Sequence, residues 1–292
     1  MLGSSGNSCV KQKIDDSVKP LSMQISDRVL FRLYQDSRPR SLEVAPLQKG
    51  LVLVYDGEEL IEEGVGFGVP VVKYGHKTYF SSSAHCSISK NENGFVLTKL
   101  YVLDAISRKS VTRSFYINDG FYRFLHKSFE KAYLGSKQFS PFFGKVMELR
   151  QMFGIQTKFI RVEPKGAVAI KFSIQPTSIE VQVDLSGLDK FGCEEILLLN
   201  EQGATFFREY ADSEGLSLFD SKIGAWNEVE AKDASLSCMN GSLTFGLEKR
   251  SDSLLFRGWE KTKGRFAWTG LSYSLSPHVS LFKYVIRLKN LN

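Results

Sequence analysis

The sequence has few cysteines and no motif that would bind a metal. Four cysteines occur among 292 residues, and no two of them form a C-x-x-C pair. Small secreted domains that depend on disulfides carry cysteine at a much higher density. His76, His85 and Cys86 come nearest to a ligand cluster, but their spacing on one extended strand would hold them apart. We therefore expect reduced thiols, a cytoplasmic location, no metal site and no cofactor.

Long apolar runs and nucleotide or hydrolase motifs are missing as well. No stretch approaches the roughly 20 apolar residues of a membrane-spanning helix, and the polar residues from Met1 to about Asp27 contain no core of a secretory signal. There is no G-x-S-x-G motif. The glycines at 64, 66 and 68 do not fit a dinucleotide loop, because Val69 occupies the position of its third glycine and no helix follows. On a strand they would leave a bare strip, and we expect an aromatic side chain to pack on it.

Aromatic residues are plentiful, and their pattern is typical of strands. The chain contains 22 Phe and 11 Tyr, and 42% of its residues are hydrophobic. Apolar and polar residues alternate from Ile179 to Leu185 and from Phe282 to Leu288, the pattern of antiparallel strands with one wet face. No βαβ alternation is present. The sequence predicts a mainly β protein, a large antiparallel β-sandwich, with a supersandwich-like arrangement as an open alternative.

The chain divides into a tail and one domain. Residues 1–25 are polar and are expected to form a disordered or loosely attached tail. Residues 26–292 are expected to form a single β-sandwich domain with a two-helix insertion at about 119–154. Asp119 and Ser140 are suitable N-caps for the two helices, and Gly135 and Gly154 suit their ends.

Charge is distributed unevenly along the C-terminal half. From Asp189 to Glu230 there are ten acidic residues against three basic ones, and from Lys249 to Lys289 nine basic against two acidic. Most such runs are solvated faces. Two alternatives stay open, in which the segments pair across the sheet or flank a cleft. The net charge of +6 permits a polyanionic partner, although nucleic acid is the least favoured one.

All three tryptophans lie in the last quarter of the chain. If Lys263-Gly264 forms a two-residue hairpin loop, Trp259 falls opposite Trp268 on one face, and Arg257 shares that face. A cross-strand tryptophan pair can be purely structural, and it is also what a sugar-stacking platform looks like. The candidate ligand-binding residues are Trp226, Arg257, Trp259 and Trp268.

Acidic residues near a predicted loop give the catalytic candidates. Glu201 follows a buried apolar strand, where loops of a rigid scaffold tend to carry sites. Glu209 and Asp220 are the next candidates, since glycoside hydrolysis uses two carboxyl groups about 5 to 9.5 Å apart. We predict a carbohydrate-recognising β-sandwich, with sugar-modifying activity left open. The alternatives are a non-enzymatic module that binds another protein and a polyanion-binding protein; no membrane association is expected.

Overall fold

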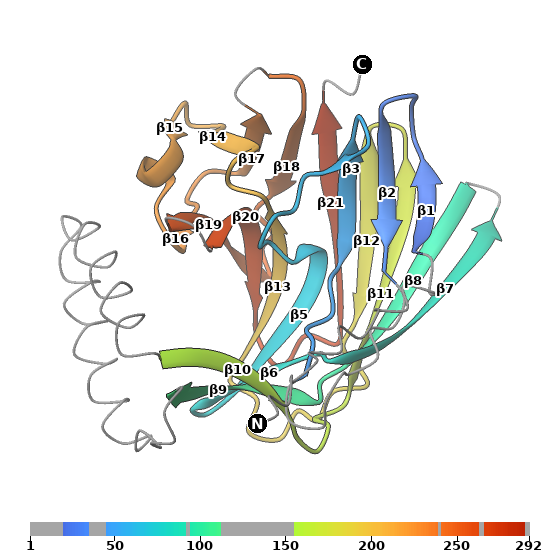
Figure 1. The fold of residues 1–292 in the computed structure, drawn as a ribbon, viewed down its shortest axis with the longest axis vertical. Helices are drawn as coiled ribbons and strands as arrows, with labels where there is room; N and C mark the ends of the chain where they lie inside the picture. The colour runs from blue at the N-terminus through green and yellow to red at the C-terminus, as the bar shows by residue number, and fades with distance from the viewer. Residues whose placement is uncertain are drawn as a thin grey trace, which may run out of the picture.

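Two antiparallel β-sheets form the protein, with almost no helix among the described residues (Figure 1). The computed structural model describes residues 20–34, 45–91, 94–111, 155–238, 241–262 and 266–289. One sheet has 12 strands and the other has nine. The predicted mainly β, antiparallel architecture is therefore confirmed.

The larger sheet runs in the order β1-β2-β3-β5-β13-β20-β19-β16, with β4, β6, β9 and β10 attached beside this path. Its strands are β1 Leu21–Gln24, β2 Val29–Leu33, β3 Leu51–Tyr55, β4 Glu58–Glu59, β5 Gly66–Tyr74, β6 Lys77–Phe80, β9 Ala105–Val111, β10 Ile155–Arg161, β13 Glu195–Gln202, β16 Asn227–Glu228, β19 Ser253–Thr262 and β20 Phe266–Leu275.

The smaller sheet runs in the order β15-β14-β17-β18-β21-β12-β11-β8-β7. Its strands are β7 Ser83–Asn91, β8 Gly94–Val102, β11 Ala167–Gln175, β12 Ser178–Asp184, β14 Phe207–Asp212, β15 Ser217–Phe219, β17 Asp233–Cys238, β18 Thr244–Glu248 and β21 Leu281–Lys289. A single 3-10 turn, η1 Asp220–Ile223, follows β15.

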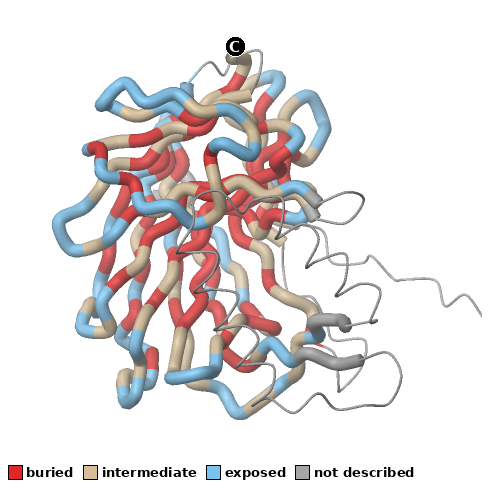
Figure 2. Tube along the Cα trace, turned by 90° about the vertical axis from the view of Figure 1, so that its left-hand side faces the viewer, coloured by how far each residue is buried: buried red, intermediate tan, exposed pale blue. Residues whose placement is uncertain are grey.

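Alternating side chains place the core between the sheets. β12 and β21 are neighbours in the smaller sheet, and in both of them every second residue is buried and the residues between are mostly exposed. Both predicted alternating runs are therefore confirmed as strands. Figure 2 shows buried stretches along the strands and exposed ones mainly in the connections.

Aromatic side chains fill much of this interior. Phe67 of β5 meets Phe245 of β18 edge to face, with ring centroids 5.2 Å apart, and Phe245 meets Phe207 at 5.0 Å. All three rings are fully buried. Edge-to-face pairs of this kind add about 0.5–1.5 kcal/mol beyond the burial of apolar area.

One of the three glycines near β5 supports an aromatic ring, as predicted. A Cβ on Gly68 would lie 2.8 Å from Cε1 of Phe172, which comes from the opposite sheet. The expectation is confirmed at Gly68 only. At Gly64 and Gly66 the nearest atoms are backbone atoms of Gln202 and Leu51.

The four ends of the two strand paths differ in length. β15 has three residues, β16 has two and β1 has four. β7, by contrast, has nine residues and pairs with β8 along its whole length. It contains no proline, and it lies at the right-hand margin of the molecule (Figure 1).

Two expectations about chain organisation concern segments at or beyond the limits of the described residues. Leu21–Gln24, which the sequence analysis placed in the tail, pairs as β1 with β2. The predicted helices at about 119–154 lie outside the described residues. Among the described residues, no helix is long and apolar enough to cross a membrane.

Candidate functional site

The hairpin of β19 and β20 places its two tryptophans on opposite faces of the larger sheet. Trp259 pairs with Thr269, and Trp268 pairs with Glu260. The connection is one residue longer than the predicted two-residue loop, because Thr262 pairs with Phe266. A shift of one residue moves a side chain to the other face of a sheet. The predicted side-by-side pairing of Trp259 with Trp268 is therefore wrong.

Trp259 and Arg257 belong to the inner face of the hairpin. The Trp259 Nε1–H donates to the backbone oxygen of Ala204 at 3.2 Å, and its ring packs against the core. The Arg257 guanidinium lies 4.7 Å from the centre of the Tyr210 ring, and its Nε donates to the oxygen of Ile223 at 3.1 Å. These contacts account for both side chains structurally, so neither offers an open stacking face.

Trp226 and Trp268 form the aromatic pair that the outer face presents. Their ring centroids lie 5.4 Å apart at an interplanar angle of 36°. Trp268 is 4% exposed and lies beneath, whereas Trp226 is 40% exposed. The Nε1–H of Trp268 donates to Oε2 of Glu260 at 3.3 Å. One accessible indole face and one carboxylate thus occur together.

The backbone holds Trp226 in an uncommon conformation. Its φ is +58°, a left-handed value that costs a bulky residue about 1–2 kcal/mol. Two hydrogen bonds from β19 fix the residues just before Trp226, since the N–H of Trp259 donates to Gly224 O at 2.7 Å and Arg257 donates to Ile223 O. Arg257 therefore positions the segment that carries Trp226.

A row of glycines lies beside Glu201 on the same outer face. Glu201 pairs with Gly66 on one side and Gly270 on the other, and Gly270 pairs in turn with Gly258. A Cβ on Gly258 would lie 2.3 Å from Cη2 of Trp268, and one on Gly270 would lie 2.6 Å from the backbone oxygen of Asn200 and 3.0 Å from Cγ of Glu201. Gly258 is thus needed so that the Trp268 ring can lie flat on the sheet, and Gly270 so that the backbone and side chain of the neighbouring strand can approach.

Two acidic groups on this face hold their protons more tightly than usual. Burial raises the pKa of Glu201 to about 7; the N–H of Val65 opposes this rise, and the carboxylate of Glu260 adds to it. Burial also raises the pKa of Glu260, against the hydrogen bond from Trp268. Glu201 is 8% exposed. A carboxyl group with a pKa near 7 can both give and accept a proton at neutral pH.

The other two predicted acids lie on other elements than Glu201, which belongs to β13. Glu209 is on β14 of the smaller sheet. Asp220 lies in η1 and takes two hydrogen bonds of 2.6 Å from Arg208, which lower its pKa. The Asp220 carboxylate is therefore occupied by a structural ion pair.

The acidic and basic segments are mostly not paired with each other. Lys249 and Glu228 form an ion pair of 3.4 Å between them. Other acids of the first segment are bound by bases outside the second, as Glu195 is by Lys73. For the described residues, the solvated-face interpretation fits better than pairing across the sheet.

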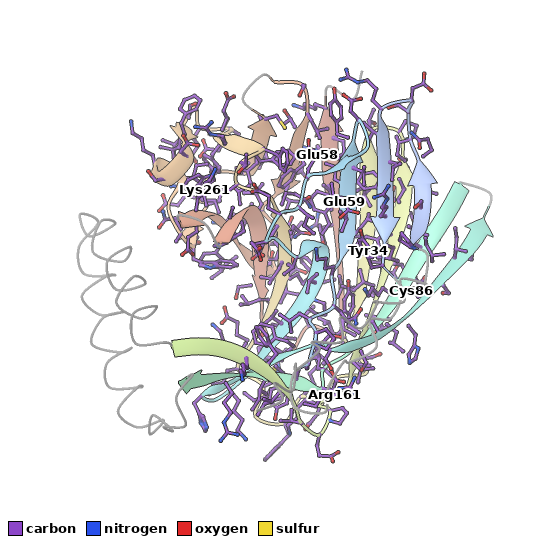
Figure 3. The ribbon with its side chains drawn as sticks, in the orientation of Figure 1. Tyr34, Glu58, Glu59, Cys86, Arg161 and Lys261 are labelled. Atoms are coloured by element: carbon purple, nitrogen blue, oxygen red, sulfur yellow. The ribbon has the colours of Figure 1, made fainter. Side chains whose placement is uncertain are left out.

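A second polar cluster surrounds Glu59, which is labelled together with Tyr34 in Figure 3. The Tyr34 hydroxyl and the Arg32 guanidinium both donate to Oε1 of Glu59. Burial, followed by the bond to Glu59, raises the pKa of Tyr34 to about 12. These three groups satisfy one another and tie β2 to β4, which is a structural role.

No metal centre emerges from the described part of the chain. There, no three His, Cys, Asp or Glu side chains are grouped so that they could hold an ion. His76 follows β5 in the larger sheet, whereas His85 and Cys86 lie on β7 in the smaller one.

Sequence reasoning missed Glu260 and the glycine row. The error followed from the assumed loop length, because a three-residue loop would have paired Glu260 with Trp268 directly. Gly258 and Gly270 then fall opposite each other, and that signal could have indicated a close approach on the outer face.

Comparisons with known proteins found a likeness to solved structures. No family model matches the chain, and no curated protein matches it. A solved structure of a galactose mutarotase-like protein from Lactobacillus casei aligns with a TM-score of 0.38 and 7% identity, covering 92% of this chain and 99% of that one.

Proposed function

We propose that the protein recognises a carbohydrate on the outer face of the larger sheet. The observation that carries the proposal is the Trp226 ring, which a left-handed backbone holds against Trp268, 40% exposed, beside the carboxylate of Glu260. An aromatic face can cover the apolar side of a sugar ring, and carboxylates accept hydrogen bonds from its hydroxyl groups. Backbone strain of this kind is a sign of function when the surroundings enforce it.

Glu201 is the group that we propose to exchange a proton with the bound sugar. It lies two strands from Glu260 on the same face, and the two carboxyl groups interact. This part of the proposal corresponds to sugar-modifying activity. Glu209 and Asp220 have no role in it.

Tryptophan fluorescence tests the binding directly. We expect one or more members of a panel of neutral mono- and oligosaccharides to change the emission of the protein. Trp226→Ala should weaken the binding that gives this response by about fivefold or more, since a stacking aromatic contributes roughly 1 kcal/mol or more. Trp259→Phe is the matched control and should bind with nearly unchanged affinity. An emission spectrum that no glycan alters would refute the proposal.

The catalytic part needs a separate measurement. With a sugar that binds, Glu201→Gln should retain the fluorescence response and lose any change in the sugar that NMR detects in the wild-type sample. If wild-type protein binds the sugar but leaves it unchanged, the site is a recognition site only.

A further inference from the structure

A hollow of about 570 Å³ lies on the outer face of the smaller sheet. It is bounded by strands β7, β8, β11, β12, β18 and β21 of this sheet, by the residues after β18, and by Tyr273, which reaches it from β20 of the larger sheet. Its polar lining includes Lys171, Ser173, Glu180, Gln182, Arg250 and Lys283. This face points away from the larger sheet, so the hollow is separate from the Trp226 site.

Three of these side chains form a row across adjacent strands. Lys171 pairs with Gln182, and Gln182 pairs with Lys283. Neighbouring strands lie about 4.8 Å apart, so the two lysines stand about 10 Å apart with an amide between them. Both lysines are exposed.

The hollow has an excess of positive charge. Among the described residues Lys171, Lys283 and Arg250 form no ion pair, whereas Glu248 is bound by Arg287. Glu180 accepts a hydrogen bond of 3.2 Å from Gln175. Asp184, diagonal to Lys171, accepts hydrogen bonds from the hydroxyl and N–H of Ser186, and the charge of Lys171 adds to the lowering of its pKa.

Among the described residues, three cations without an ion pair thus line the hollow together with two acidic side chains, of which Glu248 is bound by Arg287 and Glu180 accepts a hydrogen bond from Gln175. Arg250 and Lys283 belong to the basic C-terminal segment that the sequence analysis singled out. The structure thus brings part of that segment together with a lysine from β11, more than one hundred residues earlier in the chain than Lys283.

We propose that this hollow binds an acidic oligosaccharide, whose sulfate or carboxylate groups lie against Lys171 and Lys283. The hydroxyl of Ser173 and the amide of Gln182 can bond sugar hydroxyls between the charges. Single-stranded nucleic acids are held by exposed aromatic rings. The two tyrosines that border this hollow, Tyr273 and Tyr284, are buried in the core, so the lining favours a saccharide.

The test compares two double variants of equal charge. Lys171→Gln/Lys283→Gln removes the row, and Lys77→Gln/Lys232→Gln removes two exposed lysines elsewhere. Calorimetry at about 0.1 M salt, where charges more than about 10 Å apart are largely screened, would use a heparin-derived hexasaccharide, an oligomer of uronic acid, sodium sulfate, sodium phosphate and a single-stranded oligonucleotide. Circular dichroism would verify that each variant is folded.

We expect at least one acidic oligosaccharide to bind, and the row variant to weaken it by about tenfold or more because charged hydrogen bonds are lost. The control variant should stay within about twofold of wild type, since its charge loss is remote and screened. Equal weakening in both variants, or binding of the oligonucleotide alone, would overturn the proposal. So would free sulfate or phosphate binding as tightly as the oligosaccharides, or no binding by any probe.

This outcome is independent of the neutral-sugar site. Trp226→Ala should leave acidic oligosaccharide binding unchanged, and the row variant should leave the fluorescence response to neutral sugars unchanged. Failure of either proposal is therefore visible without the other.

Discussion

Tryptophans on the two faces of the β19–β20 hairpin differ in their surroundings. On the inner face, Trp259 has its ring against the core and its N–H bonded to Ala204. On the outer face, Trp268 lies over Gly258 and supports Trp226, whose ring remains accessible. An indole that is satisfied on all sides stabilises the fold, whereas one that is displayed at a cost in backbone strain is available for binding.

The largest effect should come from the inner face. Trp259→Ala removes a packed ring and a hydrogen bond, and we expect a loss of about 4 kcal/mol in the free energy of unfolding. Urea denaturation followed by circular dichroism measures it. Trp226→Ala, the outer counterpart, should change stability by less than about 1.5 kcal/mol, because lost stacking and relieved strain partly cancel. Similar losses in both variants would erase the distinction between the faces.

Protonation of Glu201 should appear as a pH dependence of stability. Its folded pKa of about 7 is above the ordinary 4.5, so the folded state binds more protons between these values. The free energy of unfolding should therefore fall as pH rises from about 4.5 to 7, by up to about 3 kcal/mol. Glu201→Gln should remove this fall and be more stable than wild type at pH 8.

Glu195 serves as a control, because its pKa is shifted in the opposite direction to that of Glu201. Burial raises the pKa of Glu195, but hydrogen bonds from Lys73 and Ser274 outweigh this effect, so the pKa is lowered. Its contribution is present above its ordinary pKa and is lost on acidification. Glu195→Gln should leave the fall toward pH 7 in place; if that fall disappears instead, it does not come from Glu201.

The glycine beneath Trp268 gives a smaller effect confined to the outer face. Gly258→Ala places a Cβ 2.3 Å from the Trp268 ring, so we expect a loss of about 2 kcal/mol and a weaker response to sugars. Gly215→Ala meets no atom within 4 Å and should cost about 1 kcal/mol through its backbone alone, with binding intact. Normal sugar binding by Gly258→Ala would show that Trp268 does not support the site.

The smallest effect should come from the ion pair that joins the acidic and basic segments among the described residues. Lys249→Gln removes the contact with Glu228, and we expect a change of about 0.5 kcal/mol. The same urea titration measures it. A loss above about 2 kcal/mol would show that pairing of the two segments matters more than their solvation.

Local pattern was enough to predict the sandwich but not the site. Alternation in β12 and β21 identified strands because burial has period two in a sheet. The partner of each strand depends on loops and long-range packing, which no local pattern contains. Because the connection between Thr262 and Phe266 is one residue longer than assumed, Trp259 and Trp268 lie on opposite faces of the sheet. Glu260 lies on the face of Trp268 instead.

The site acids show the same limit. Glu201 was singled out as an acid after an apolar strand, and it lies on the same face as Glu260, two strands away. Asp220 looked equivalent in sequence, but Arg208 neutralises it from β14. Whether a carboxylate is free depends on its spatial neighbours, and those are set by the fold.

The unequal strand ends have a consequence for handling the protein. Proteins usually keep the outermost strands of a sheet short, twisted or charged, because unpaired backbone groups recruit further chains. In the part of the chain that the structure describes, three of the four path ends follow this rule, whereas β7 has nine residues without proline, no second strand beside it, and Ile88 47% exposed. Concentrated samples should therefore aggregate first along β7, and a proline or a lysine introduced there is the simplest way to keep them monodisperse.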